Sequence, residues 1–243
     1  MKGVSAAVFA IVLGCAGASR GHEPLRLTTE YSPPFNFTDD AGEVVGVSTD
    51  LLKAIAKRAG VPITVELMSW PRAYNEALAK PNVCVYSTAM VESRIGLFQW
   101  VGPLARNDWV VFGREDDPDP PRSVEALKGK RIGVYQGDVK ETFFKQMPGY
   151  ILDSAPRDEL NALKLSTGRV DYWVSGAMSG ASYVQRSRIT NIKPLFGFRD
   201  VELALACNKQ APSETIAALS NALKSFREEG ALKEIEEKYL LSK

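Results

Sequence analysis

The chain has 243 residues, with 30 lysines and arginines against 29 aspartates and glutamates, a single histidine and three cysteines. This composition is ordinary for a globular protein and excludes collagen-like, disordered and disulfide-scaffold classes. The near-zero charge balance argues against a nucleic-acid partner, which would require clustered excess lysine and arginine. Because His22 is the only histidine, most histidine-based metal and acid–base sites are excluded, and we expect neither a metal nor a cofactor.

The first residues are typical of a secretory signal peptide. A basic start precedes an apolar run, Val4–Leu13, which is too short to span a bilayer. Ala16 and Ala18 form an A-x-A cleavage site, which predicts a signal peptide over residues 1–18. The segment that ends at Cys15 also resembles a lipoprotein site, at which this cysteine would carry a lipid anchor. Either route predicts a periplasmic protein.

Export would place the two remaining cysteines, Cys84 and Cys207, in an oxidising compartment. Cys84 and Cys207 form an even pair in an oxidising compartment, where a disulfide is more common than a catalytic or metal site. The alternative is two separately buried free thiols. A bridge would close a loop of more than a hundred residues and stabilise the fold by about 4 to 5 kcal/mol in the chain-entropy model.

The first half of the mature chain alternates predicted strands and helices. Strands are expected over 25–28, 63–67 and 83–86, with helices over 51–59 and 72–79 between them. Ser48, Thr49 and Asp50 offer N-caps to the first helix, and Gly60 offers a left-handed C-cap. This alternation is typical of parallel α/β sheets.

A second α/β series follows a proline-rich segment, Asp116–Pro121, which suits a surface loop beside a domain crossing. The expected elements are strands over 131–135, 169–175 and 201–206, a helix carrying Phe143 and Phe144, a helix over 158–165, and a helix that Ser213 caps. The last helix carries an apolar stripe of Ile216, Leu219, Leu223 and Phe226, which indicates a core-facing side. The fold class is therefore α/β.

Several short motifs, in order, resemble the family 3 extracellular solute-binding proteins, periplasmic receptors that deliver polar amino acids and related solutes to ABC importers. The resemblance runs from about Leu25 to Tyr239. The motifs are Tyr31-Ser32-Pro33-Pro34-Phe35, Gly46-Val47-Ser48-Thr49-Asp50-Leu51, Trp70-Pro71-Arg72-Ala73, Glu92-Ser93-Arg94 with Phe98 and Gly102-Pro103, Gly133-Val134-Tyr135-Gln136-Gly137, Gly168-Arg169-Val170-Asp171, and Gly230 before Ile235 and Tyr239.

The resemblance implies a type II periplasmic binding protein fold, in which two α/β lobes are joined by two crossover strands and the ligand lies between them. Lobe 1 would comprise residues 25–110 and 198–243, and lobe 2 residues 111–197. Cys84 and Cys207 then lie in the same lobe, which strengthens the disulfide prediction.

Arg94 is the first candidate ligand contact, because family members hold the ligand's carboxylate with an arginine at this place and a guanidinium can grip it with two hydrogen bonds. Ser87 and Thr88 lie just ahead, at the end of a predicted strand, where their hydroxyls could share the same carboxylate. The family commonly has a threonine five residues before the arginine, but this chain has Ala89 there.

Aromatic side chains and a helix start supply the other candidates. Tyr31, Phe35 and Trp70 resemble residues that flank ligands in the family, although Phe35 suits the core equally, and Arg72 is either a second cation in the cleft or a solvated helix residue. From lobe 2, the turn Tyr135-Gln136-Gly137-Asp138 would present backbone N–H groups to an anionic or carbonyl group.

One position departs from the amino-acid-binding relatives. Five residues after Asp171, where they carry an aspartate that pairs with the ligand's ammonium, this chain has Gly176, preceded by Ser175. A buried ammonium without a charge partner is costly. Either Asp138, Asp108 or Glu202 supplies that charge, or the ligand is a carboxylate without a free amine.

The resemblance implies a monomeric binding protein that closes its lobes on a small carboxylate-bearing solute, an amino acid or related organic acid, and then docks on an ABC permease. An enzyme resembling the periplasmic dehydratases is the alternative, but no second carboxylate motif clearly points into the cleft as a general acid. A ligand-sensing partner of a membrane receptor is a further alternative, because it would use the same closed lobes.

Overall fold

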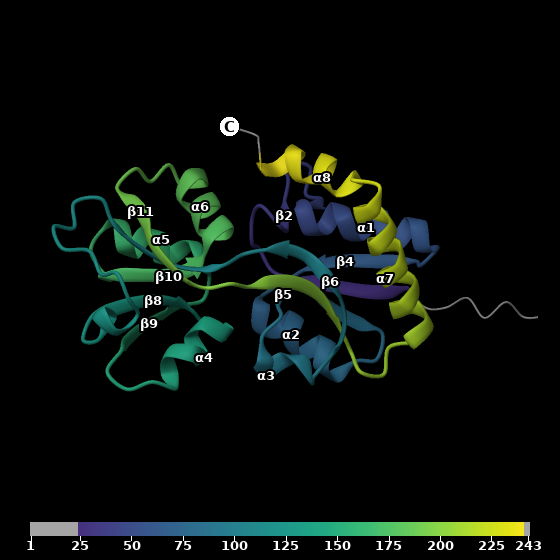
Figure 1. The fold of residues 1–243 in the computed structure, drawn as a ribbon, viewed down its shortest axis with the longest axis horizontal. Helices are drawn as coiled ribbons and strands as arrows, with labels where there is room; N and C mark the ends of the chain where they lie inside the picture. Colours follow the sequence, from purple (N-terminus) through teal and green to yellow (C-terminus); the bar gives the residue numbers. More distant parts are fainter. Residues whose placement is uncertain (1–23, 241–243) are drawn as a thin grey trace, which may run out of the picture.

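The computed structural model describes residues 24–240, so the predicted signal peptide, Cys15 and His22 lie outside the described residues. Two five-stranded sheets form two lobes, each with helices on both faces (Figure 1). The predicted two-lobed α/β fold is therefore confirmed. In the part of the chain that is described, no helix is both long and apolar enough to cross a bilayer.

The sheet of the first lobe has the strand order β4-β1-β5-β12-β6. Its strands are β1 (Leu25–Thr29), β4 (Ile63–Leu67), β5 (Val83–Ala89), β6 (Gln99–Arg106) and β12 (Glu202–Cys207). β1 runs parallel to β4 and β5, whereas β12 runs antiparallel to β5 and β6. A two-stranded ribbon, β2 (Phe37–Thr38) and β3 (Val44–Val45), precedes the first helix.

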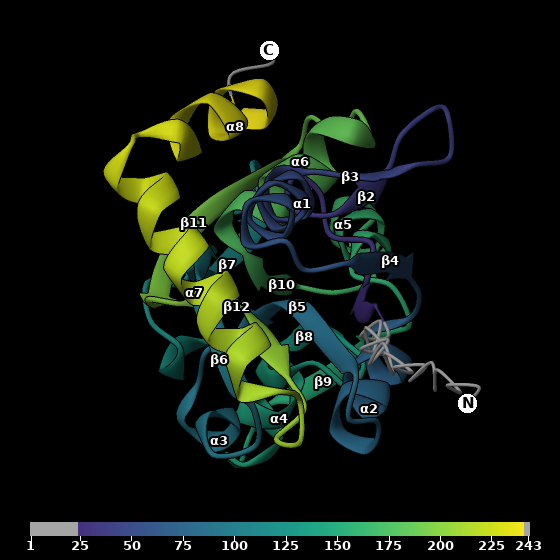
Figure 2. The same ribbon diagram turned by 90° about the vertical axis from the view of Figure 1, so that its right-hand side faces the viewer.

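Alternating side chains of this sheet form two cores, because successive strand residues point to opposite faces. Cys84 packs with α1 (Val47–Ala59) and α7 (Ser213–Glu228), whereas its neighbour Val85 packs with α2 (Trp70–Ala79). The predicted apolar stripe of α7 is confirmed as core-facing. The remaining helices are α3 (Glu92–Ile95) and α8 (Ala231–Leu240), and Figure 2 shows α7 running along the first lobe into α8.

The sheet of the second lobe has the order β11-β7-β10-β8-β9. Its strands are β7 (Trp109–Arg114), β8 (Arg131–Tyr135), β9 (Ile151–Ala155), β10 (Tyr172–Gly176) and β11 (Ile192–Arg199). Helices α5 (Glu159–Ser166) and α6 (Ala177–Arg186) pack on the face that carries Trp173. On the face of Val174, α4 (Val139–Lys145) packs beside the 3-10 turn Glu125–Leu127.

The chain crosses between the lobes twice, from β6 into β7 and from β11 into β12 (Figure 1). The boundaries predicted between residues 110 and 111 and between 197 and 198 fall inside β7 and β11, a few residues from these connections. The proline-rich segment 116–121 follows the far end of β7, so the expectation that it lies beside a crossing is wrong. It is a surface loop at the outer end of the second lobe (Figure 1).

The expected helix caps are correct in part. Gly60 is left-handed, with φ of 66°, and ends α1 as predicted. The N-cap of α1 is Gly46, because the chain is already helical at Ser48, Thr49 and Asp50. Likewise α7 begins at Ser213 itself, and Pro212 occupies the capping position.

The disulfide between Cys84 and Cys207 is present. The two cysteines lie directly opposite each other on the neighbouring strands β5 and β12, with both side chains fully buried. The bridge thus joins the first passage of the chain through lobe 1 to the segment that returns from lobe 2.

Candidate functional site

An inner cavity of about 40 Å³ lies between the lobes, at the carboxyl ends of their parallel strands. Glu30 directly follows β1, Ser87 lies near the end of β5, and Tyr135 ends β8. The complete lining is Glu30, Ser32, Trp70, Ser87, Ala89, Arg94, Asn107, Trp109, Tyr135, Asp138, Lys140, Asp158, Ser179, Tyr183, Val201 and Leu203.

Arg94 is the principal cation that the first lobe contributes to the inner cavity. Only 7% of the residue is exposed, and its guanidinium carbon lies 5.0 Å from the ring centroids of both Trp70 and Tyr74. These cation–π contacts hold the guanidinium without consuming its hydrogen-bond donors. None of the ion pairs among residues 24–240 includes Arg94, so its fork of donors is available to an anionic group.

Ser87 and Thr88, at the end of β5, have different surroundings. Ser87 lines the inner cavity in a left-handed conformation, with φ of 55°, and its hydroxyl donates to the side-chain oxygen of Asn36. Such a conformation is uncommon outside glycine and is concentrated at functional sites. Thr88 is fully buried, and its hydroxyl donates to the carbonyl oxygen of Val85 instead.

Asp158 is a buried carboxylate at the start of α5. Its Oδ1 accepts hydrogen bonds from Trp173 Nε1 at 2.9 Å and Asn161 Nδ2 at 3.2 Å, and its Oδ2 accepts one from Ser175 Oγ at 2.5 Å. Burial raises the pKa of Asp158 above its ordinary value, although Lys140 and these donors oppose the increase. The second lobe therefore presents a fixed acceptor to the cavity.

Asp138 and Lys140 form a buried ion pair at the start of α4, with 2.8 Å between Oδ1 and Nζ. Asp138 also caps this helix by accepting a hydrogen bond from the backbone N–H of Lys140. Burial acts to raise the pKa of Asp138, but Lys140 and Arg94 together hold it below its ordinary value. Asp138 therefore belongs to the second lobe yet interacts electrostatically with the arginine of the first.

Glu30 is the third acid of the inner cavity, and its pKa is raised, unlike that of Asp138. Burial, reinforced by the negative charges of Asp138 and Asp158, raises its pKa to about 8, against the opposing effects of Tyr135 and Lys140. The inner cavity thus carries three carboxyl groups and two permanent cations. A positively charged ligand group beside Glu30 would lower its pKa and favour the ionised form. Among residues 24–240, no cluster of histidine, cysteine, aspartate or glutamate is placed to hold a metal ion.

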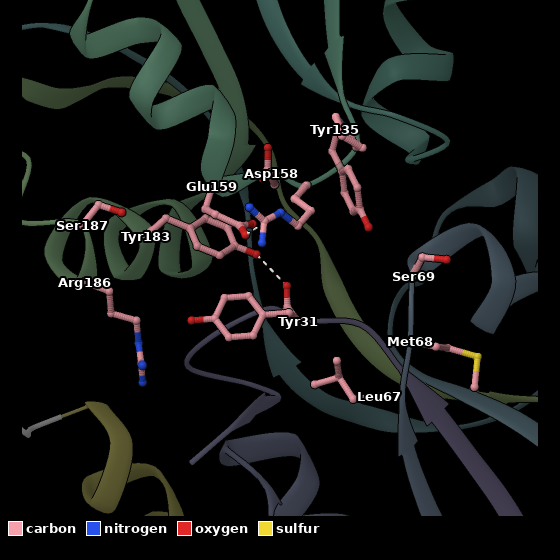
Figure 3. A pocket seen from close by; sticks show the side chains of 12 residues that line it. Tyr31, Leu67, Met68, Ser69, Tyr135, Asp158, Glu159, Tyr183, Arg186 and Ser187 are labelled. Carbon is pink, nitrogen blue, oxygen red and sulfur yellow. Dashed lines mark hydrogen bonds and ion pairs between the residues drawn. The ribbon is translucent and has the colours of Figure 1, made fainter. Parts of the chain in front are cut away.

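Hydrogen bonds across the cleft hold the two lobes together. Trp70 Nε1 donates to the carbonyl oxygen of Gly137 at 3.2 Å, and the Tyr183 hydroxyl donates to the carbonyl oxygen of Tyr31 at 3.0 Å (Figure 3). The backbone N–H of Trp70 also donates to the Tyr135 hydroxyl at 3.4 Å. The lobes are therefore closed over the inner cavity.

An outer chamber of about 600 Å³ adjoins the inner cavity, and Tyr135, Asp158 and Tyr183 line both spaces. Figure 3 shows Tyr31 and Tyr183 on one side of this outer chamber and Met68, Ser69 and Tyr135 on the other. Its remaining lining residues are Leu67, Pro156, Arg157, Glu159, Arg186 and Ser187.

The family model of the bacterial extracellular solute-binding proteins, family 3, matches residues 25–242. The chain belongs to this family. The match covers nearly all of the two lobes, including both sides of the cleft, and confirms the resemblance inferred from the motifs.

This solute-binding protein is similar to the histidine-binding periplasmic protein of Escherichia coli K12, at 32% identity over 112 residues, which are 45% of this chain and 42% of that relative. The alignment thus spans less than half of the relative's length. A solved ancestral arginine-binding protein bound to arginine has 26% identity and a TM-score of 0.80, with 89% of this chain and 98% of that one covered. A histidine kinase sensor domain with similarity to periplasmic binding proteins shares the fold, with 22% identity, a TM-score of 0.84, and 90% and 96% coverage.

The candidate residues of this solute-binding protein separate into two groups. Trp70, Ser87, Arg94, Tyr135 and Asp138 line the inner cavity, and Tyr31 lines the outer chamber. The others lie outside both linings. Phe35, Thr88 and Ser175 are buried, and Phe35 belongs to the core. Arg72 is exposed and pairs with Glu76, Gln136 and Gly137 are exposed, and Gly176 precedes α6.

Gly176 has no room for a side chain, because the side-chain amide of Asn107 would overlap a Cβ atom there. Asn107 comes from the first crossing and holds the start of α6: its Oδ1 accepts from the backbone N–H groups of Met178 and Ser179, and its Nδ2 donates to Ser179 Oγ. An asparagine therefore occupies the space of the aspartate that the amino-acid-binding relatives were expected to carry.

Several lining residues were not predicted from the sequence. Glu30, Lys140 and Asp158 bring charge to the inner cavity, whereas of the three acids that were considered as substitutes only Asp138 lines it. Asp108 instead pairs with Arg106 in the first crossing, and Glu202 is exposed. A usable signal existed for Glu30, which immediately follows a predicted strand, where ligands of open α/β sheets bind.

We expect Glu30→Gln to remove a component of pH-dependent stability. Because the pKa of Glu30 rises from 4.5 to about 8 on folding, the folded state binds more protons than the unfolded state between these values. The free energy of unfolding therefore falls as pH rises through this window. At pH 9 the variant should be more stable than the parent by about 1–2 kcal/mol, or about 4 °C in Tm, with little difference at pH 4.5.

Thermal unfolding from pH 4.5 to 9 measures this effect. Glu43→Gln is the matched control, because Glu43 is exposed in the turn before β3. Parallel pH profiles for the parent and Glu30→Gln would show that Glu30 is not protonated in the closed protein.

Proposed function

We propose that this protein binds a zwitterionic solute, an amino acid or a close relative, between its lobes and delivers it to an ABC permease. Arg94 would hold the carboxylate, and Glu30 and Asp158 would face the cationic group. The single observation that carries the proposal is the buried Arg94 guanidinium, which contacts the rings of Trp70 and Tyr74 and lines a cavity between the lobes.

The charge pattern of the inner cavity supports a ligand that carries an amine. Three carboxyl groups face two cations, and the pKa of Glu30 is raised chiefly by burial and further by the negative charges of Asp138 and Asp158. An ammonium group would bring a positive charge to these acids, and its hydrogen bonds to carboxylates would offset the cost of its desolvation. The related proteins named for binding histidine and arginine are consistent with such a ligand. A carboxylate without an amine would add a further negative charge beside these acids.

Location and partner are also proposals. The family is extracellular, and we propose a periplasmic monomer that is exported by residues 1–18, with signal peptidase cleavage or a lipid anchor at Cys15 as the two routes. The closed lobes would form the surface that the permease recognises. We also propose binding without turnover, although a carboxyl group of raised pKa such as Glu30 also suits a general acid, so turnover belongs in the test.

The test is isothermal titration calorimetry with ligands selected from a thermal-shift screen of amino acids, organic acids and amines. Arg94→Ala should weaken binding of the selected ligand by about 100-fold or more, because it removes a charge-assisted, bidentate contact in a buried site. The affinity of Arg94→Lys should lie between those of the parent and Arg94→Ala, since lysine keeps the positive charge but lacks the planar fork of donors.

Arg72→Ala is the matched control, because Arg72 is exposed on the adjacent helix and outside the cavity lining. Equal affinity of the parent and Arg94→Ala would refute the proposed role of Arg94. Mass spectrometry of the ligand recovered after long incubation should show it unchanged, whereas a converted product would indicate an enzyme.

A further inference from the structure

The inner cavity is much too small for a whole amino acid. Its volume of about 40 Å³ is far below the range of ordinary ligand sites, about 300–1,000 Å³. The closed lobes can therefore enclose only the charged groups of a ligand beside Arg94 and Asp158. Whatever else the ligand carries must occupy the outer chamber, which is about 600 Å³ and shares the side chains of Tyr135, Asp158 and Tyr183 with the inner cavity.

Both lobes contribute walls to the outer chamber, so its occupant would contact both. Tyr31 and the segment Leu67–Ser69 belong to the first lobe, whereas Pro156–Glu159 and the α6 residues Tyr183 and Arg186 belong to the second. Figure 3 shows Tyr31 and Tyr183 from one lobe each, with Tyr135 across from them. A volume of this size falls in the range of ligand sites, about 300–1,000 Å³.

The charged side chains at the outer chamber already have partners. Arg157 Nε lies 3.3 Å from Glu159 Oε1, and the Arg186 guanidinium lies 4.2 Å from the ring centroid of Phe37. Asp158 is held by three donors. The surface left to a ligand is therefore mainly aromatic and apolar.

The aromatic wall has the geometry of a stacking platform. The rings of Tyr31 and Tyr183 are 6.3 Å apart and inclined by 29°, and the hydroxyl of Tyr183 is fixed by its bond to Tyr31. Leu67 and Met68 are half-buried, and Met68 lies on the opposite side. Aromatic and thioether groups of this kind favour a large, planar, polarisable substituent over a small aliphatic one.

We propose that the outer chamber binds a large aromatic side chain of the solute, so that the preferred ligand is an aromatic amino acid rather than a small or purely polar one. This inference rests on the proposed function, because it assumes that Arg94 holds the carboxylate. It adds a second recognition site, formed by Tyr31, Met68, Tyr135 and Tyr183, to the charged inner cavity.

Calorimetric titration of the full mature protein with L-tryptophan, L-arginine and L-alanine tests the inference. L-tryptophan should bind about 10–100-fold more tightly than L-alanine, as expected for burial of a large apolar group. It should also bind more tightly than L-arginine, which has similar length without an aromatic ring. Ser69→Trp fills the outer chamber from an exposed position without a side-chain hydrogen bond, and should weaken L-tryptophan binding at least about tenfold while sparing L-alanine.

Ser213→Trp is the matched control, because Ser213 is also exposed at a helix start but lies on α7, outside the outer chamber. If L-alanine or L-arginine binds as tightly as L-tryptophan, or if Ser69→Trp affects all three equally, the inference is wrong and the proposed function stands. If none of them binds and Arg94→Ala changes no affinity in the wider screen, the proposed function fails as well.

Discussion

Replacing Cys84 and Cys207 together by alanine is expected to lower the free energy of unfolding by about 5 kcal/mol, because the bridge closes a loop spanning 123 residues and thereby restricts the unfolded chain. The loss of two fully buried sulfur atoms adds a packing cost of the same sign. Such a loss is a large fraction of the stability of an ordinary domain.

Guanidinium unfolding of parent and variant measures the difference. Parent protein kept fully reduced is the control, because it loses the bridge and retains both sulfur atoms, which separates the restriction of the unfolded chain from the packing cost. A difference of less than about 1 kcal/mol between oxidised and reduced parent would contradict the expected effect of the bridge.

Gly176→Asp, which introduces the acid expected in amino-acid-binding relatives, should destabilise this protein by about 3 kcal/mol. The new side chain must displace Asn107, which donates to Ser179 and accepts from two backbone N–H groups at the start of α6. Each of these groups would be left without its partner close to a buried site.

Removing the side chain of Asn107 as well tests whether the two side chains compete for the same space. In Asn107→Gly/Gly176→Asp the new carboxylate has room and can cap α6 itself, so the double variant should recover about 2 kcal/mol relative to the sum of the single variants. Gly197→Asp is the control, since a Cβ there makes only ordinary contacts. Chemical unfolding of the four proteins completes the cycle, and additive costs would show that Asn107 and position 176 do not compete for space.

The alternation of strands and helices in the chain was sufficient to predict the class of fold. β1, β4 and β5 are uninterrupted apolar or alternating runs, and their bounds agree closely with those expected. β6 and β11 were missed because they contain Gly102-Pro103 and Pro194, residues that ordinarily argue against a strand. The prolines are tolerated in these two strands, each of which leads into a connection between the lobes.

The candidate site was predictable only where a residue type and a local pattern agreed. Arg94 and Trp70 lie in short motifs that single them out, and both line the inner cavity. Asp158 follows β9, a strand too polar to be expected, and its partners Trp173 and Ser175 come from another strand. Their convergence depends on the order of strands in the sheet, which local sequence does not encode.

The position of β12 has a consequence for how the protein acquires its structure. β12 lies between β5 and β6 in the first sheet, although it is made only after the whole second lobe. The second lobe can fold as one continuous segment, whereas the sheet of the first lobe keeps a gap until β12 has been made. Pairing of β12 with β5 places Cys207 directly opposite Cys84, so the native disulfide joins the strand that closes this gap to the sheet that was made first.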